Sequence, residues 1–478
     1  MTCFFKDLKY LYKTVYMICF CFLDFCRMLS LYIHIPFCVK NCPYCSFSVV
    51  QNPNDEMIQT YLNNLHSEID EWWKIFWKAE IRTIYFGWWT PNLIWLEEIK
   101  KLIYHCEEVF DCENAGELSF ECNPFPQDQV YEFVSDLQKS FKKYPRVRFS
   151  FGIQSLDNWV LENAWRPYTF PWMVDFLRGL RDLKLENSVY NFDFMAFGVF
   201  NQTKKWDLQL WTPSALEFFQ DFVNSWFADS FSLYMLELFE HQKWKKPEWN
   251  LPVNQQSWMF WNEDEIYEEF DILKNIIQEW WYKRYEISNF AAVGKSSIHN
   301  RVYREMEDYL WLWLSASSFI NAKSPYFWAM GEYLMNKPPF DKGGVPICRD
   351  GGIINSDNIP PLSPLAEWGH DFTQLQWIRR TNTPYFPKYI WKEKLVESAI
   401  QPMSQSDYLI ESFFLSLRTD RWIDDVLKFE SVLVKDYSEK IKLYEENWFL
   451  KLREKWFFLS DEGMDCYNWI ITELLSEI

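Results

Sequence analysis

The chain has 478 residues, of which 49% are hydrophobic and 24% charged, and its 48 Lys+Arg and 67 Asp+Glu give a net charge of -19. This composition excludes disordered and fibrous proteins, and the length suffices for one large domain with a smaller one. The negative charge, without a local basic patch, argues against nucleic acid as a partner.

Tryptophan and glycine occur in unusual proportions. The chain has 28 Trp and only 13 Gly, although glycine makes up about 7% of an average protein. Packing gives no reason for such an exchange. We therefore look to the positions of the tryptophans for the cause of the excess of Trp and the deficit of Gly.

Residues 1–27 form an apolar stretch before the first predicted strand. Its uncharged part, Thr14 to Leu23, covers ten residues, about half of what a membrane-spanning helix needs. No small-residue cleavage site of a signal peptide follows it. We interpret residues 1–27 as an extension before a true start at Met28, and we predict no stable membrane span.

The twelve cysteines bunch along the chain. Disulfide-rich secreted folds space their cysteines more evenly. This distribution predicts a reducing compartment, the cytoplasm.

Six short apolar runs alternate with helical patterns after Met28. They lie at Leu31 to Ile35, Thr83 to Phe86, Leu118 to Phe120, Val147 to Ile153, Val189 to Met195 and Ser232 to Leu238. Repeated β–α units predict an α/β fold with a parallel sheet. We expect a partial (βα)6-type barrel over residues 28–320.

The remaining chain has a different pattern. Residues 321–374 are rich in Pro, Gly, Asn and Asp, which predicts an irregular insertion. Residues 375–478 are predicted to form a C-terminal domain, with helices after Asp407, a hairpin around Glu454-Lys455-Trp456 and a helix from Glu462. We expect this winged-helix-like domain to pack on the barrel rather than to bind DNA.

Three cysteines follow the first predicted strand as Cys38-x3-Cys42-x2-Cys45. Three thiolates on one short loop can ligate three irons of a [4Fe–4S] cluster and leave the fourth iron open. Zinc would need a fourth protein ligand, and none lies at zinc-finger spacing. His34 is either a core histidine or a hydrogen-bond donor to the cluster.

The segment from Tyr32 to Cys45 resembles the start of the radical SAM (S-adenosylmethionine) enzymes related to oxygen-independent coproporphyrinogen III oxidase. Further segments match in the family's order: Gly87-Trp88-Trp89-Thr90-Pro91, Glu121-Cys122-Asn123-Pro124, Ser150 to Ser155, Trp165-Arg166, Asp193, Tyr285 to Phe290 and His299-Asn300. The resemblance covers Ser30 to Phe319 and, more loosely, Asp407 to the C-terminus. It implies a radical SAM barrel that holds a [4Fe–4S] cluster and SAM.

Five residues of these motifs lie at or near the carboxyl ends of successive predicted strands, where barrel enzymes build their sites: Cys38, Gly87, Glu121, Gln154 and Asp193. The resemblance implies that the open iron takes the amino and carboxylate groups of SAM. It assigns SAM binding to Tyr32, Tyr44, Gly87, Trp88, Trp89, Thr90, Glu121, Gln154, Arg166 and Asp193.

Two branches of the family differ in what they do. The dehydrogenases carry a fourth cysteine two residues after the third, where this chain has Phe47. The HemW-type heme chaperones resemble the chain in this loop and carry a His-Asn-x-x-Tyr-Trp motif. Here the motif begins at His299 and departs at its last position, Arg304. The resemblance implies heme binding by His299 and Tyr303; core packing or capping is the structural alternative for His299.

The sequence therefore favours a heme chaperone that binds heme or a porphyrinogen, a [4Fe–4S] cluster and SAM. Its expected partners are heme-accepting proteins and an electron donor. The alternatives are an oxygen-independent coproporphyrinogen III dehydrogenase, which converts propionates to vinyl groups, and a structural metal-binding barrel.

Many tryptophans stand where the related proteins have glycine: Trp88, Trp89, Trp165, Trp281, Trp311, Trp313, Trp422 and Trp448. Trp280-Trp281 ends a predicted helix, and Trp456 lies at a predicted hairpin turn, where a positive φ favours glycine. We hypothesise that these codons are UGA, read as glycine in the source organism. UGG codons at Trp88, Trp89, Trp311 and Trp313 would contradict this hypothesis.

Overall fold

The computed structural model describes residues 28–39, 42, 44–45, 50–87, 91–198, 213–225, 227–236, 263–312, 317–321, 324–327, 377–382, 397–403, 411–412, 414–420, 443–447, 449–453, 456–467 and 470–471. The prediction for residues 1–27 lies outside this part, as do most of residues 321–374. Within the described part, no helix is both long and apolar enough to cross a bilayer.

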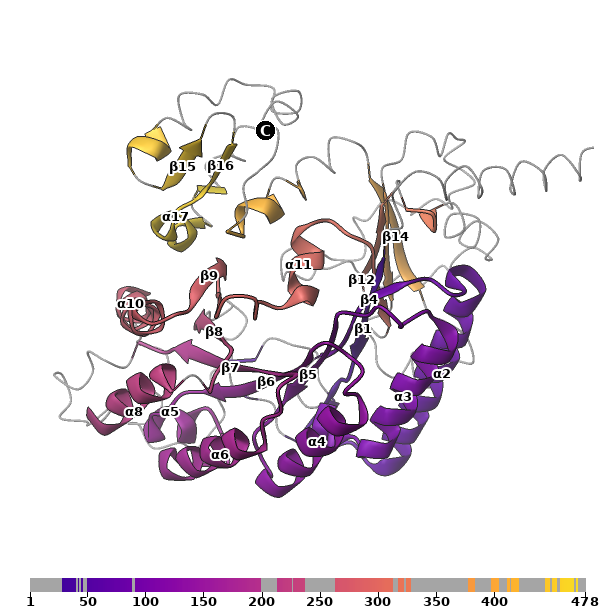
Figure 1. Cartoon of the computed structure of the whole chain (residues 1–478), viewed down its shortest axis with the longest axis horizontal. Helices are drawn as coiled ribbons and strands as arrows, with labels where there is room; N and C mark the ends of the chain where they lie inside the picture. The colour runs from indigo at the N-terminus through magenta and orange to yellow at the C-terminus, as the bar shows by residue number, and fades with distance from the viewer. Residues whose placement is uncertain are drawn as a thin grey trace, which may run out of the picture.

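A curved, open sheet forms the centre of the molecule (Figure 1). Six of its strands run parallel, in the order β1 (Leu29–His34), β4 (Ile81–Gly87), β5 (Glu117–Cys122), β6 (Val147–Gln154), β7 (Ser188–Ala196) and β8 (Ser230–Met235). These strands confirm the six predicted runs and the α/β fold.

Further strands extend both edges of this sheet, and all of their pairings are antiparallel except that of β11 with β1. Next to β8 lie β10 (Asn289–Ala291) and β9 (Lys283–Glu286). Next to β1 lie β11 (Tyr309–Leu312, parallel to β1), β12 (Ser317–Asn321), β13 (Trp377–Asn382) and β14 (Glu397–Met403). The sequence patterns do not predict this extension, in which β13 and β14 follow the proposed insertion.

Helices cover the outer, convex face of the sheet (Figure 1). They are α2 (Asp55–Phe76), α3 (Leu96–Val109), α4 (Gln127–Ser140), α5 (Asn158–Asn163), α6 (Phe170–Leu183), α8 (Pro213–Asn224) and α10 (Glu263–Glu279). Asn54 begins α2 as a capping residue, because its side chain accepts the Met57 amide at 2.8 Å.

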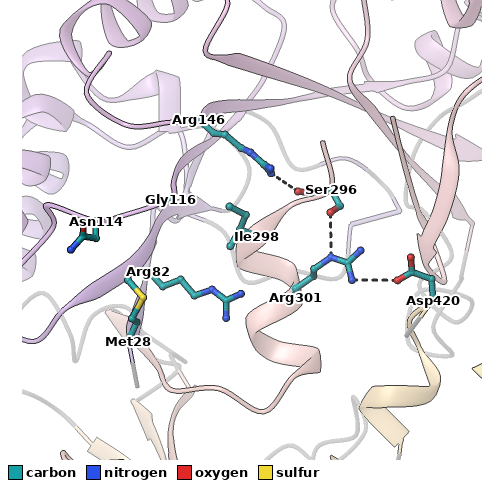
Figure 2. A pocket seen from close by; sticks show the side chains of 9 residues that line it. All are labelled: Met28, Arg82, Asn114, Gly116, Arg146, Ser296, Ile298, Arg301 and Asp420. Carbon is teal, nitrogen blue, oxygen red and sulfur yellow. Dashed lines mark hydrogen bonds and ion pairs between the residues drawn. The ribbon is translucent and has the colours of Figure 1, made fainter. Parts of the chain in front are cut away.

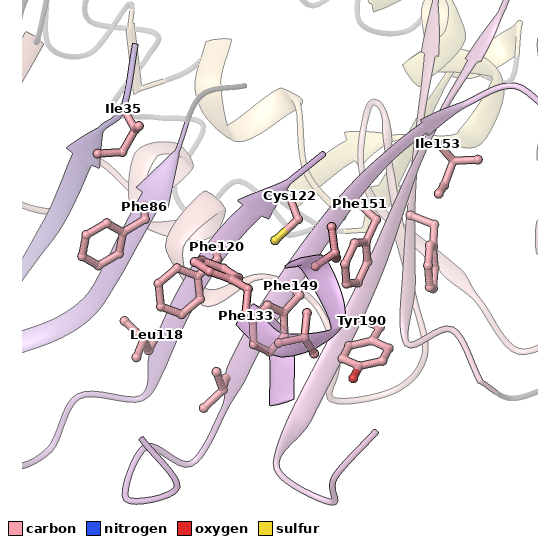
Figure 3. Close-up of a cluster of buried hydrophobic side chains, with 14 of the residues drawn as sticks. Ile35, Phe86, Leu118, Phe120, Cys122, Phe133, Phe149, Phe151, Ile153 and Tyr190 are labelled. Atoms are coloured by element: carbon pink, nitrogen blue, oxygen red, sulfur yellow. The ribbon is translucent and has the colours of Figure 1, made fainter. Parts of the chain in front are cut away.

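A row of aromatic rings fills the space between the outer face and these helices (Figure 3). Phe86, Phe120 and Phe149 stack from strand to strand with centroids 5.3 and 5.6 Å apart. Phe133 of α4 meets Phe120 edge-on. Side chains alternate between the faces of a strand, so the residues between these phenylalanines point to the inner, concave face.

The inner face is partly covered by α11 (Ile298–Arg304), which lies between β9 at one edge of the sheet and β4 (Figure 1). The C-terminal part contains the hairpin β15 (Leu450–Arg453) and β16 (Trp456–Leu459), followed by α17 (Asp461–Asp465). It contacts the barrel through Arg284, whose Nη1 donates to Asp465 Oδ1 at 2.7 Å. The domain boundaries remain predictions.

Candidate functional site

The three cysteines of the spaced motif lie on one loop at the carboxyl end of β1. Cys38 belongs to the short strand β2 (Phe37–Cys38), and the Cys45 amide donates to the Cys42 carbonyl at 3.0 Å. All three are buried free thiols. Within the described residues, no three His, Cys, Asp or Glu side chains are close enough together to bind a metal ion. The residue types and their shared loop nevertheless fit a cluster with three thiolate ligands.

Arg166 connects this loop to the end of β6. Its Nη1 lies 3.7 Å from Cys42 Sγ, its Nη2 donates to the Gly152 carbonyl, and its Nε donates to Tyr168 at 2.6 Å. A Cβ at Gly152 would lie 2.9 Å from Gln154 Nε2, closer than side chains tolerate. Glycine at position 152 therefore leaves room for the side chains of Gln154 and Arg166, which are both predicted SAM residues.

Gln154 ends β6 in a strained conformation. It is buried and has a φ of 70°, a left-handed backbone that costs about 1–2 kcal/mol in a residue other than glycine. Strain of this kind is common in ligand-binding sites.

Gly87 ends β4 against the ring of Tyr32. A Cβ at this position would overlap the Tyr32 ring, so only glycine allows the ring to lie there. The Tyr32 ring stacks on Tyr85 at 5.7 Å, and Tyr85 donates to Glu121 Oε1 at 2.7 Å. Three predicted SAM residues, Tyr32, Gly87 and Glu121, are thus close together on the inner face.

Asp193 occupies the inner face of β7. It accepts hydrogen bonds from Ser150 at 3.0 Å and from Asn191 at 2.8 Å. Burial raises the pKa of the Asp193 carboxyl, although these hydrogen bonds oppose the shift. Tyr44 of the cysteine loop packs edge-on against Phe197, which follows the same strand. Trp88, Trp89, Thr90 and Phe47 lie outside the described residues.

His34 has the environment of a core histidine. It is buried, its Nδ1 lies 3.3 Å from the Tyr32 hydroxyl, and its carbonyl accepts from Tyr61 at 2.6 Å. Burial lowers its pKa well below the usual value. Hydrogen bonding from His34 to a cluster remains a prediction.

His299, predicted to bind heme, is buried on the inner face within reach of the SAM residues. Its Nδ1 lies 2.7 Å from Thr83 Oγ1 and its Nε2 lies 2.6 Å from the Tyr303 hydroxyl. Its ring stacks on Tyr85 with centroids 4.8 Å apart and lies 6.2 Å from Tyr32. Burial lowers the pKa of His299 to about 3, so the imidazole is neutral at pH 7. The predicted heme and SAM residues therefore lie side by side.

The helix that carries His299 begins on a buried carboxylate. Glu117, the first residue of β5, accepts from the Ser297 hydroxyl at 3.2 Å, the Ile298 amide at 3.1 Å and the His299 amide at 3.3 Å. A carboxylate at a helix N-terminus satisfies amides that lack partners within the helix. Thr83 and Glu117 were not among the site residues predicted from the sequence. Their only signal was that polar residues interrupt apolar strands.

The backbone has the glycine-like conformation at only some of the tryptophans that we predicted to stand in place of glycine. Trp165 has a φ of 56°, as predicted for a glycine position. Trp281 is not among the described residues with positive φ, and Trp456 lies in β16 opposite Arg453, after the turn and not within it. The predicted backbone was therefore wrong at these two positions. Trp311 packs on Tyr32 at 4.4 Å and donates to Tyr303 at 2.9 Å.

A cavity of about 510 Å³ lies at the opposite edge of the sheet, where the strands begin (Figure 2). Arg82, Arg146 and Arg301 contribute to its wall. Arg82 pairs with Glu307, and Arg301 with Asp420 at 3.3 Å. Arg146 donates to the Ser296 carbonyl at 3.0 Å. This cavity is separate from the residues that the sequence analysis selected.

Residues 32–201 match the model of the radical SAM superfamily. Among curated proteins, the chain is 27% identical over 288 residues to the heme chaperone HemW of Buchnera aphidicola subsp. Schizaphis graminum, covering 60% of this chain and 69% of that protein. It is 29% identical over 301 residues to the heme chaperone HemW of Bacillus subtilis, covering 61% and 71%.

A relative of the second branch matches a shorter part. The oxygen-independent coproporphyrinogen III oxidase of Synechocystis is 26% identical over 193 residues, covering 38% of this chain and 39% of that protein. Among solved structures, the Escherichia coli coproporphyrinogen III oxidase (HemN), described as a radical SAM enzyme, superimposes with a TM-score of 0.62 at 17% identity, covering 95% and 92% of the two chains. The chain thus matches the radical SAM model over residues 32–201, has the fold of the HemN structure, and is similar in sequence to proteins of both branches.

Proposed function

We propose that the protein is a heme chaperone of the cytoplasm, which binds heme on the inner face of its barrel and passes it to acceptor proteins. The relatives named heme chaperone HemW support this proposal. The observation that carries it is the neutral, buried His299, held between Thr83 and Tyr303 beside Tyr32 and Tyr85.

His299 has the properties of an iron ligand. An imidazole ligand must be unprotonated, and burial lowers the pKa of His299 to about 3. Histidine ligands commonly donate their second ring N–H to a fixed acceptor, and the Thr83 hydroxyl lies 2.7 Å from Nδ1. Nε2, which now contacts the Tyr303 hydroxyl at 2.6 Å, would then be the atom of His299 that holds the iron.

Cys38, Cys42 and Cys45 would hold a [4Fe–4S] cluster in this proposal. When bound, the cluster supplies an electron and an open iron for SAM. Arg166, which lies between Cys42 and Gly152, has a forked, permanently charged group suited to a carboxylate. Glu121 and Asp193 provide acceptors for the hydroxyl groups of SAM.

Hemin titration of the anaerobically reconstituted full-length chain tests the proposal. We expect saturable binding with a Soret band that is lost in His299→Ala and retained in the control His105→Ala, whose imidazole lies between α2 and α3. Protoporphyrinogen formation from coproporphyrinogen III, with SAM and a reductant, would instead favour the dehydrogenase. Absence of hemin binding would contradict the chaperone proposal.

A further inference from the structure

Two guanidinium groups share one buried carboxylate beside the helix of His299. Arg304, the last residue of α11, donates through Nε to Glu286 Oε1 at 2.7 Å, and Arg418 Nε lies 3.9 Å from the same oxygen. The other oxygen of Glu286 accepts from Asn289 Nδ2 at 2.5 Å. Arg418 Nε is buried and has no hydrogen-bond partner within the described part of the chain.

The neighbouring cations have carboxylates of their own. Arg284 pairs with Asp465 at 2.7 Å, Lys274 pairs with the same residue at 2.5 Å and with Asp271 at 2.8 Å, and Arg301 pairs with Asp420. Arg304 and Arg418 share Glu286 as their one carboxylate, and Arg418 also packs over the neutral Tyr467 ring, 5.2 Å from its centroid. Burial and the nearby positive charge of Arg304 both lower the pKa of Arg418. This repulsion decreases when a second anion binds between the two groups.

Backbone contacts account for the attachment of the segment that carries Arg418. The Ile287 amide donates to the Arg418 carbonyl at 3.1 Å, and the Asp420 amide donates to the Tyr285 carbonyl at 3.2 Å. Thr419 forms a β-bridge with Glu286. These backbone contacts need neither guanidinium, and the contact of Arg418 with the Tyr467 ring does not require a second arginine beside Glu286.

The pair is connected to both predicted ligand sites. A chain of hydrogen bonds runs from Glu286 through Asn289, Ser232 and Asn191 to Asp193, with distances of 2.5 to 3.0 Å. On α11, Arg304 follows His299 by five residues, about 7.5 Å along the helix axis and about 140° around it. A ligand bound to His299 would therefore contact Arg304 only through a flexible arm that extends around the C-terminal end of α11.

We propose that Arg304 and Arg418 bind a carboxylate of the tetrapyrrole, a heme propionate. This inference rests on the proposed heme binding. Guanidinium forks match the two oxygens of a carboxylate and keep their charge at every physiological pH. The residue that departs from the motif, Arg304, thereby gains a role that tryptophan at this position would not have.

A comparison of hemin with hemin dimethyl ester, whose propionates are esterified and uncharged, tests whether Arg304 and Arg418 bind a propionate. We expect the full-length protein to bind hemin about 10-fold more tightly than the ester, as expected for one charge-assisted hydrogen bond. Arg418→Gln should bind hemin about 10-fold more weakly and the ester with unchanged affinity. Its Soret maximum should not move, because His299 still provides the iron ligand.

Arg178→Gln is the matched control, because Arg178 is exposed on α6 and pairs with Asp175; it should behave as wild type. Equal affinity of the unmodified protein for hemin and the ester would overturn the propionate site and leave heme binding intact. Binding of neither compound would overturn both proposals. Should Arg418→Gln fail to fold, the ratio measured on the unmodified protein decides.

Discussion

The two faces of the central sheet are built from the same strands and serve different purposes. On β6 and β7, Phe149, Phe151 and Phe192 point to the outer face and stack under the helices, whereas Ser150 and Asp193 point inward and bond to each other. Side chains one position apart thus separate the core from the candidate site. A single strand can therefore carry stability on one face and chemistry on the other.

Among substitutions at the candidate site, removal of a cluster cysteine should have the largest effect, which is complete loss of bound iron. After anaerobic reconstitution with iron and sulfide, Cys42→Ala should retain no bound iron above background, because three thiolates are needed. Cys122→Ala removes a buried thiol from the outer face (Figure 3) and should bind iron like wild type. Bound iron and visible absorbance measure the difference. Equal iron in both variants would contradict the assignment.

The outer face should determine stability. Phe149→Ala should lower the free energy of unfolding by about 3–5 kcal/mol, because it leaves a cavity in a fully buried aromatic row. The neighbouring Ser150→Ala should lower it by about 1 kcal/mol, the net value of a hydrogen bond. Urea unfolding measures both. If Phe149→Ala and Ser150→Ala lower the free energy of unfolding by similar amounts, the outer face does not contribute more to stability than the inner face.

The buried histidine on the inner face should make stability depend on pH. The pKa of His299 falls from 6.5 to about 3 on folding, so the unfolded chain takes up the proton first. Its contribution to stability is complete above pH 6.5 and is lost as the pH falls towards 3, at about 1.4 kcal/mol per pH unit. Urea unfolding between pH 7.5 and 5 should show a smaller slope for His299→Gln. An unchanged slope would contradict this assignment.

The smallest change in stability is expected at Trp165, a residue with a strained backbone that directly precedes Arg166 of the candidate site. Trp165→Gly should stabilise the protein by about 1 kcal/mol, because glycine adopts a φ of 56° without strain. Trp159→Gly, inside α5, should destabilise it by a similar amount, about 1 kcal/mol. Thermal unfolding measures both. If both variants lose stability, the glycine hypothesis fails at this position.

The sequence predicted those features that local patterns encode. Apolar runs located the six parallel strands, and motifs in the family's order selected Tyr32, Glu121, Gln154, Arg166 and Asp193, which the structure places at the inner face or beside the cysteine loop. Partners distant in sequence were not predictable. Thr83 meets His299 across 216 positions, and no local signal marks such a pair. Strands β13 and β14 were missed because they add to the sheet after a long intervening segment.

The cap on α11 has a consequence for the order of folding. A helix of seven residues is not stable alone in water, and three donors at its start bond to Glu117 of β5. His299 and Tyr303 therefore come into register only after β5 has joined the sheet. The position of His299 and Tyr303 therefore depends on the sheet and not on the helix alone. A change at Glu117, 182 positions earlier in the chain, would disturb this His–Tyr pair without touching either ring.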